Sequence, residues 1–265
     1  MDESIHSEGL RLHAHLASPP GGGAPAPALV LCHGFPSGPR GAASSGVTFP
    51  ELADRVAREA GWFALSFNFR GTGTSEGDFS APGWLADIRA MVDVLGARDD
   101  VRGVWLAGVG EGGTLAICAA ARDSRVRGVA TLAAPASLRE WGRDPARLLE
   151  YARRMGIVRT PGFPPVPASW SREVSLVDAV EAARRVAPRP LLVLHGTDDG
   201  VGPVDEARLL AQAGGPAAEL RLVFSAGHEL RHDPRAIAGL LGWLDRQPIG
   251  LPVESPVQRR AAMVR

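Results

Sequence analysis

A histidine and an aspartate occupy positions at which a base and its orienting acid could meet. His228 follows the strand expected at 219–224, and Asp199 follows the strand expected at 190–194. Open α/β sheets carry their ligand sites at the carboxyl ends of the strands, where both residues are expected. A carboxylate bound to one ring nitrogen orients an imidazole and stabilises its protonated form. We therefore predict that Asp199 and His228 form a general-base pair.

A third position completes this pattern but carries no side chain. The segment Gly108-Val109-Gly110-Glu111-Gly112 has the frame G-x-S-x-G, a sharp strand-to-helix turn that raises a serine hydroxyl into an active site. Gly110 stands in place of the serine, so no acyl-enzyme can form there. Because glycine tolerates a positive φ, the turn itself is expected to survive the change.

The elements that must position these residues alternate along the chain. Such alternation predicts an α/β fold with a mostly parallel central sheet and helices on both faces. An early edge strand is expected at 10–16, where apolar and polar residues alternate. Further strands are expected at 28–32, 62–69, 103–107, 126–132, 190–194 and 219–224. Helices are expected at 51–60, 84–95, 112–121, 203–213 and 234–244.

One long connection interrupts the rhythm. Residues 136–187 separate two strands, where a connection of ~2–6 residues is usual. We interpret this segment as a small helical lid over the carboxyl ends of the strands; an ornamented crossover helix is the alternative. The expected organisation is a core of residues 1–135 and 188–246, the lid 136–187, and a loosely held C-terminal extension, 247–265.

Four motifs, in this order, resemble the α/β-hydrolase superfamily over nearly the whole chain. The first is the loop 33–36, and the second is an arginine-glycine turn within 68–77, for which we expect a structural role. The glycine-substituted turn around Gly110 is the third. The acid loop 195–203, with the histidine loop 225–228, is the fourth. The chain looks most similar to small bacterial members that are dienelactone-hydrolase-like or esterase-like.

The resemblance implies an α/β-hydrolase fold and roles for individual residues. It places the acid at Asp199 rather than Asp198, and an oxyanion hole at the backbone N–H groups of Phe35 and Glu111. The Glu111 side chain would lie near the site, either as an acid or base or as a solvated or salt-bridged carboxylate. We expect substrate contacts from loop residues and lid aromatics, which favour an apolar or aromatic small molecule. They are His33, Gly34, Trp141, Tyr151 and Trp170.

Three functions fit a site that lacks its nucleophile. The first is a cofactor-independent lyase, isomerase or carbon–carbon bond-forming enzyme, in which His228 moves a proton on a carbonyl compound; superfamily members of this kind occur in natural-product biosynthesis. The second is a hydrolase in which His228 directs water onto an ester or lactone. The third is a non-catalytic binding protein. If Gly110 replaces a serine by engineering, the natural protein would be an ordinary serine esterase.

Composition excludes several other classes. The formal net charge is zero, so nothing predicts binding to nucleic acid or to an anionic membrane. The chain contains no lysine, which excludes a lysine Schiff base with pyridoxal phosphate. Cys32 and Cys118 lie in apolar runs and are expected to be buried free thiols. Neither metal-type spacing nor a signal peptide is apparent, so we expect a cytoplasmic protein without metal or cofactor; the oligomeric state stays open.

Overall fold

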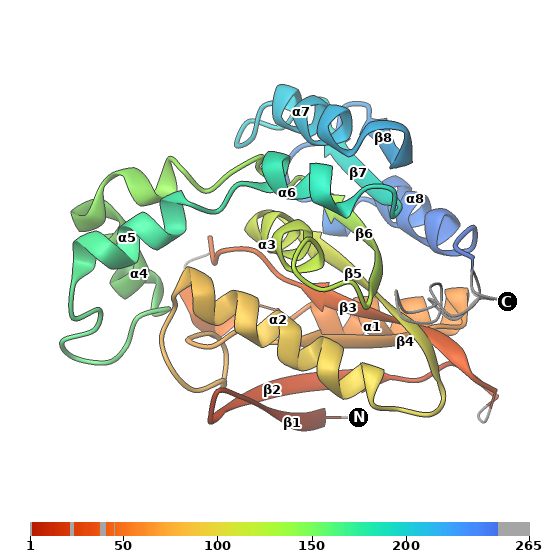
Figure 1. Ribbon diagram of the computed structural model, residues 1–265, viewed down its shortest axis with the longest axis horizontal. Helices are drawn as coiled ribbons and strands as arrows, with labels where there is room; N and C mark the ends of the chain where they lie inside the picture. The colour runs from red at the N-terminus through yellow and green to blue at the C-terminus, as the bar shows by residue number, and fades with distance from the viewer. Residues whose placement is uncertain (1, 22–23, 38–40, 45, 249–265) are drawn as a thin grey trace, which may run out of the picture.

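A twisted sheet forms the centre of the computed structural model, which describes residues 2–21, 24–37, 41–44 and 46–248 (Figure 1). In this described part the sheet has eight strands in the order β1-β2-β4-β3-β5-β6-β7-β8. The strands are β1 Asp2–Ser7, β2 Leu10–Ala17, β3 Ala26–Cys32, β4 Phe63–Phe67, β5 Val101–Val109, β6 Val126–Leu132, β7 Leu191–Gly196 and β8 Ala218–Val223. From β4 to β8 across the sheet all neighbours run parallel. The mostly parallel sheet predicted from the sequence is therefore confirmed.

The antiparallel edge of the sheet differs from the prediction. The strand expected at the edge is β2, and it pairs on its outer side with β1, from Asp2 opposite His15 to Ser7 opposite Leu10. In β1, Ile5 is the sole buried apolar residue. Its alternation is too polar to be recognised without its partner strand, and the prediction of residues 10–16 as the edge was wrong for this reason.

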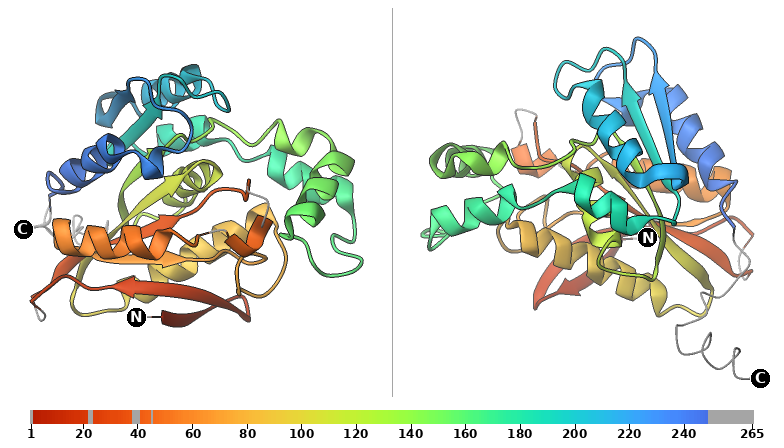
Figure 2. Two further views of the ribbon diagram at one scale, coloured as in Figure 1. Left: turned by 180° about the vertical axis from the view of Figure 1, so that it is seen from behind. Right: turned by 45° about the horizontal axis from the view of Figure 1, so that its top comes forward.

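Helices cover both faces of the sheet, as Figures 1 and 2 show. On one face lie α2 Ala81–Gly96, α3 Glu111–Ala120, α6 Ala179–Val186 and α7 Val204–Gly214. The other face carries α1 Phe49–Ala60 and α8 Pro234–Leu244. Each layer closes its own apolar cluster against the sheet, with Trp84, Ile88 and Leu210 in one and Val56, Leu240 and Trp243 in the other. The sheet is thus buried on both sides, which explains the continuous apolar run of β3.

The long connection contains two kinds of helix. α4 Pro145–Met155 and α5 Pro167–Ser175 pack on each other and stand off from the sheet at one end of the molecule (Figure 1). α6, by contrast, packs against α3 and α7 in the layer that covers the sheet. Of the C-terminal extension predicted at 247–265, Gln247 and Pro248 alone are described; Gln247 donates to the backbone oxygen of Trp243. Residues 249–265 lie outside the described part.

The arginine-glycine turn after β4 anchors the edge of the sheet. The Arg70 guanidinium donates to the buried carboxylate of Asp87 in α2 at 2.7 Å and to Glu8 at 2.9 Å. Arg159, at the end of the α4 connection, donates to the backbone oxygen of Gly71 at 2.6 Å. The turn therefore connects the β1–β2 hairpin, α2 and the segment that follows α4. This agrees with the structural role expected for it.

Candidate active site

The turn between β5 and α3 has the backbone of a nucleophile elbow. Gly110 has φ 55° and ψ −132°, a conformation that residues with side chains rarely adopt. Its N–H donates to the backbone oxygen of Leu132 in β6 at 2.9 Å, and its own oxygen accepts the N–H of Gly113 at 2.9 Å. The second bond starts α3, so the turn is fixed at both ends. The chain therefore makes the sharp strand-to-helix turn of an elbow, with glycine at the serine position.

A side chain at position 110 would point at His228. A Cβ atom built on Gly110 would lie 3.9 Å from the Cα of Gly34 and 3.9 Å from the Nε2 of His228. Both are ordinary van der Waals distances, so the surroundings leave room for a side chain there. The backbone therefore directs this position toward the imidazole.

His228 is held by Asp199 from behind. The ring Nδ1 donates to Asp199 Oδ2 at 2.9 Å, which leaves Nε2 facing position 110. The Asp199 side chain is fully buried, whereas 29% of the His228 side chain is exposed. The other carboxylate oxygen of Asp199 accepts the N–H groups of Val201 and Gly202 at 2.8 and 2.9 Å. The acid loop thus fixes the carboxylate, and the carboxylate fixes the ring.

The electrostatics of Asp199 favour its ionised form. Burial by itself raises the pKa of this carboxyl, but hydrogen bonds from Gly202, His228 and Val201 outweigh burial and hold its pKa below the usual 3.8. His195, buried in β7, brings its Nε2 to 3.3 Å from Asp199 Oδ2 and donates to the Gly202 oxygen at 3.0 Å. This second histidine positions the same loop and does not face Gly110.

The histidine of the first motif has a structural place. His33 is 2% exposed; its Nδ1 donates to the Gly34 oxygen at 2.8 Å, and its Nε2 accepts the N–H of Phe69 at 3.3 Å. Burial lowers the pKa of His33 to about 4, so the ring is neutral at ordinary pH. His33 thereby ties the loop after β3 to the loop after β4.

The two expected oxyanion-hole donors are in different situations. The N–H of Glu111 belongs to the first turn of α3, whose N–H groups have no partner within the helix. The N–H of Phe35, in contrast, donates to Oε2 of the Glu111 side chain at 2.9 Å. The hole expected from the sequence is thus closed at Phe35 by a carboxylate, and the solvated or salt-bridged placement considered for Glu111 does not describe it.

Of the aromatic residues expected in the lid, two gather at this loop. Trp141 and Tyr151 have ring centroids 4.7 Å apart, and they lie 5.1 and 6.1 Å from the ring of Phe35. Tyr151 also donates to the backbone oxygen of Pro36 at 2.7 Å, which fixes α4 over the loop after β3. Trp170 is 4% exposed and donates to the backbone oxygen of Phe79, so it serves the contact between lid and core.

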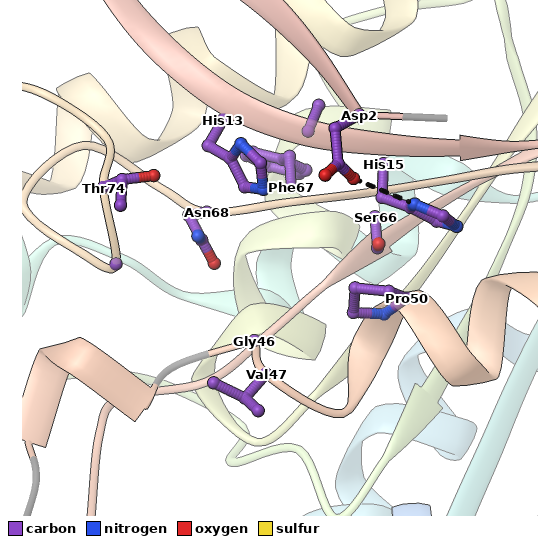
Figure 3. A pocket seen from close by; sticks show the side chains of 12 residues that line it. Asp2, His13, His15, Gly46, Val47, Pro50, Ser66, Phe67, Asn68 and Thr74 are labelled. Carbon is purple, nitrogen blue, oxygen red and sulfur yellow. Dashed lines mark hydrogen bonds and ion pairs between the residues drawn. The ribbon is translucent and has the colours of Figure 1, made fainter.

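A separate cavity of about 500 Å³ lies beside β2 and β4 (Figure 3). His13 and His15 of β2 line it, and His15 is bound by Asp2 at 3.3 Å and Asp54 at 2.8 Å. None of its lining residues belongs to the group around Gly110. We place the candidate site at Gly110, and not at this cavity, because His228 and Asp199 form a base and acid pair there.

Within the described residues no cluster of His, Cys, Asp and Glu could hold a metal ion.

Comparison with known proteins agrees with the geometry of the elbow. A family model described as alpha/beta hydrolase fold matches residues 27–164, which is more than half of the chain. This chain belongs to the α/β-hydrolase fold family. None of the curated proteins is recognisably similar to it in sequence.

Solved structures of α/β hydrolases share the fold across nearly the whole chain. The alpha/beta hydrolase GrgF from Penicillium sp. sh18 has a TM-score of 0.73 and 18% identity, covering 93% of this chain and 98% of its own. Est1E from Butyrivibrio proteoclasticus, solved with ferulic acid bound, has a TM-score of 0.69 and 20% identity over 92% and 96%. The meta-cleavage product hydrolase CumD from Pseudomonas fluorescens IP01 has a TM-score of 0.64 and 21% identity, covering 92% of this chain and 97% of its own.

Some features of this hydrolase-fold site had only a weak signal in the sequence. The binding of Glu111 to Phe35 joins residues 76 positions apart, and a glutamate after the elbow residue was the sole hint. The contact of His195 with Asp199 had the signal of i,i+4 spacing within the acid loop.

In the described part of the chain no helix is both long and apolar enough to span a membrane.

The strained elbow gives a test of stability. We expect Gly110→Ala to lower the free energy of unfolding by about 1–3 kcal/mol, because an L side chain is unfavourable at this φ and ψ even where there is room for it. Gly96→Ala is the matched control: it lies at the end of α2 without a positive φ and with nothing near its Cβ. That variant should be neutral or more stable in urea denaturation. Equal stability of both variants would contradict the strain.

The ionised Asp199 gives a test in pH. Its folded-state pKa lies below the unfolded value, so its contribution to stability is complete above that value and is lost as the pH falls through the folded pKa. Asp199→Asn should cost about 1–3 kcal/mol at pH 7 because its hydrogen bonds weaken. Measured by urea denaturation, the gap to the wild type should shrink below about pH 4. A gap that stays constant down to pH 2 would refute this, with Asp198→Asn as the reference for an exposed neighbour.

Proposed function

We propose that this α/β-hydrolase-fold protein is a cofactor-independent enzyme that moves a proton on a carbonyl-containing small molecule. His228, backed by Asp199, is its general base, and the reaction is of the lyase, isomerase or carbon–carbon bond-forming type. No acyl-enzyme forms at Gly110. One observation supports this proposal: a Cβ atom built on Gly110 would lie 3.9 Å from His228 Nε2, while His228 Nδ1 lies 2.9 Å from Asp199 Oδ2 on the other side of the ring.

The chemistry follows from the two ring nitrogens. Asp199 accepts the Nδ1 hydrogen, so the lone pair of Nε2 points at whatever lies over Gly110. A carbon acid bound there loses its proton to Nε2, and the carboxylate stabilises the imidazolium that results. Negative charge that develops on the substrate oxygen meets the Glu111 N–H at the start of α3, where the helix dipole is positive. The proton then returns from the imidazolium to the product.

Two other nucleophiles, Cys32 and Ser75, are poorly placed to restore acyl transfer. Cys32 is fully buried in β3, and burial raises the pKa of its thiol far above its usual value. The hydroxyl of Ser75 donates to the Asn68 oxygen and accepts the N–H of His13, so it is held on the far side of the loop after β4. This supports a reaction that needs a base and no covalent intermediate.

Hydrolysis by direct attack of water is the second candidate. One protein of similar fold favours hydrolysis by its name, since CumD is a meta-cleavage product hydrolase. With glycine at 110, a water molecule beside Nε2 would take the place of a serine hydroxyl and attack an ester or lactone. General-base catalysis of this kind contributes about 10²–10⁴-fold.

Removal of the base tests the function. The probe is phenylacetone in deuterium oxide. Uptake of deuterium at its benzylic α-carbon is followed by NMR. We expect the wild type to accelerate uptake and His228→Ala to lose about 10²–10⁴-fold of that acceleration. His232→Ala is the matched control, because this exposed histidine lies four residues further on and does not contact Asp199.

The same variants separate the remaining possibilities. Uptake no faster than in buffer would contradict proton transfer at carbon. Hydrolysis of phenyl acetate in ¹⁸O-water, with label in the acetate and dependence on His228, would establish the second candidate instead. If the protein accelerates neither reaction, the proposal is wrong, and binding without catalysis becomes the function to test.

A further inference from the structure

The side chain of Glu111 occupies a backbone donor of the site. Its Oε2 accepts the Phe35 N–H at 2.9 Å. The family resemblance assigns this N–H to the oxyanion that forms when an ester is attacked. A carboxylate oxygen therefore lies where negative charge would otherwise develop. This placement is specific, since the residue that carries it directly follows the empty nucleophile position.

Gly34 makes room for the carboxylate. A Cβ atom on Gly34 would lie 2.9 Å from Glu111 Oε2 and 2.9 Å from the Val109 oxygen, closer than real Cβ atoms approach such atoms. A Cβ atom on Gly110 would in turn lie 3.9 Å from the Cα of Gly34 and 3.9 Å from His228 Nε2. The carboxylate thus adjoins Gly34, the imidazole adjoins Gly110, and the two glycines adjoin each other. A substrate that covers both glycines meets both groups.

Tyr151 of α4 lies beside this arrangement. Tyr151 is packed against Phe35, and burial, followed by the nearby charge of Glu111, raises the pKa of its phenol above the usual range. Its hydroxyl donates to Pro36. The neutral phenol leaves the Glu111 carboxylate as the negative group of this part of the site.

We propose that Glu111 determines the specificity of the site: its carboxylate holds the Phe35 N–H as an internal substitute for an oxyanion and binds a hydroxyl group of the substrate. The site therefore selects hydroxylated carbonyl compounds and disfavours ester acyl transfer. This inference rests on the proposed function for the reaction itself, but the occupation of the Phe35 N–H does not.

Electrostatics decide between the two kinds of ligand. A tetrahedral oxyanion at Phe35 would face the Glu111 carboxylate at close range in a half-buried site, where like charges repel strongly. A substrate hydroxyl instead donates a charge-assisted hydrogen bond to the same carboxylate. The carbonyl oxygen then lies at the Glu111 N–H of α3, and His228 acts on the carbon that bears the hydroxyl group, next to the carbonyl.

The first experiment measures the hydrogen bond without any substrate. In ¹⁵N–¹H NMR spectra of the whole chain, the Phe35 amide proton should lie downfield in the wild type and move upfield in Glu111→Ala. Glu111→Gln should give an intermediate position, because its amide oxygen still accepts the bond. Sodium acetate added to Glu111→Ala should shift the signal back downfield. A Phe35 proton that does not respond to Glu111→Ala overturns the proposal, whatever the enzyme's reaction.

The second experiment gives the chain a serine and asks which side chain suppresses ester cleavage. Gly110→Ser should cleave p-nitrophenyl acetate weakly. Gly110→Ser with Glu111→Ala should be about 10²–10³-fold faster, the effect of one oxyanion donor. Glu229→Ala in the Gly110→Ser protein is the matched control, since it removes a nearby carboxylate that pairs with Arg231. If removal of Glu111 gives no larger gain than removal of Glu229, the proposal is wrong.

The third experiment tests the substrate class. Deuterium uptake by 3-hydroxybutanone is compared with uptake by butanone in the wild type and in Glu111→Ala, each corrected for the rate in buffer. The preference for the hydroxylated ketone should fall by about 10–100-fold in the variant, the effect of a lost hydrogen bond to a charged group. An equal preference in both proteins would show that Glu111 does not bind the hydroxyl. Failure of uptake in every protein, with a responsive Phe35 amide, would overturn the reaction and the hydroxyl selectivity but leave the occupied donor standing.

Discussion

A single hydrogen bond orients the chemistry of this site. Because Asp199 accepts the Nδ1 hydrogen of His228 at 2.9 Å, the opposite nitrogen must face the turn at Gly110. The carboxylate is itself held by two backbone N–H groups of its loop and is fully buried. The ring is therefore fixed with Nδ1 on Asp199 and with Nε2 directed at Gly110. What the site can do depends on what meets that nitrogen.

The sheet brings the partners together from distant parts of the chain. The loop after β3 supplies Gly34 and Phe35, the turn after β5 supplies Gly110 and Glu111, and the loops after β7 and β8 supply Asp199 and His228. In a parallel sheet these loops share the carboxyl edge. The lid helices α4 and α5 stand beside the same edge, and Tyr151 connects α4 to Pro36. With glycine at position 110 this framework is present, and its central position carries no side chain.

Much of this could be predicted from the sequence because the strong signals are local. Continuous apolar runs marked β3 and β7, amphipathic spacing marked α2, and the loop motifs placed Asp199 and His228 after their strands. β1 escaped because Ile5 is its single apolar residue, and because its pairing with β2 and its packing against α2 leave no mark in its own sequence. The Glu111 side chain was hard to place for a similar reason: its partner lies in another loop, and a carboxylate in a sequence carries no sign of whether it meets water or an N–H.

The tautomer of His228 tests the account most directly. Nitrogen-15 NMR of the histidine rings, recorded at alkaline pH, distinguishes a hydrogen on Nδ1 from one on Nε2. We expect a hydrogen on Nδ1, bonded to Asp199, and an Nε2 without hydrogen toward Gly110; Asp199→Asn should remove this preference. A neutral ring with its hydrogen on Nε2 in the wild type would contradict it, since no base would then face the glycine.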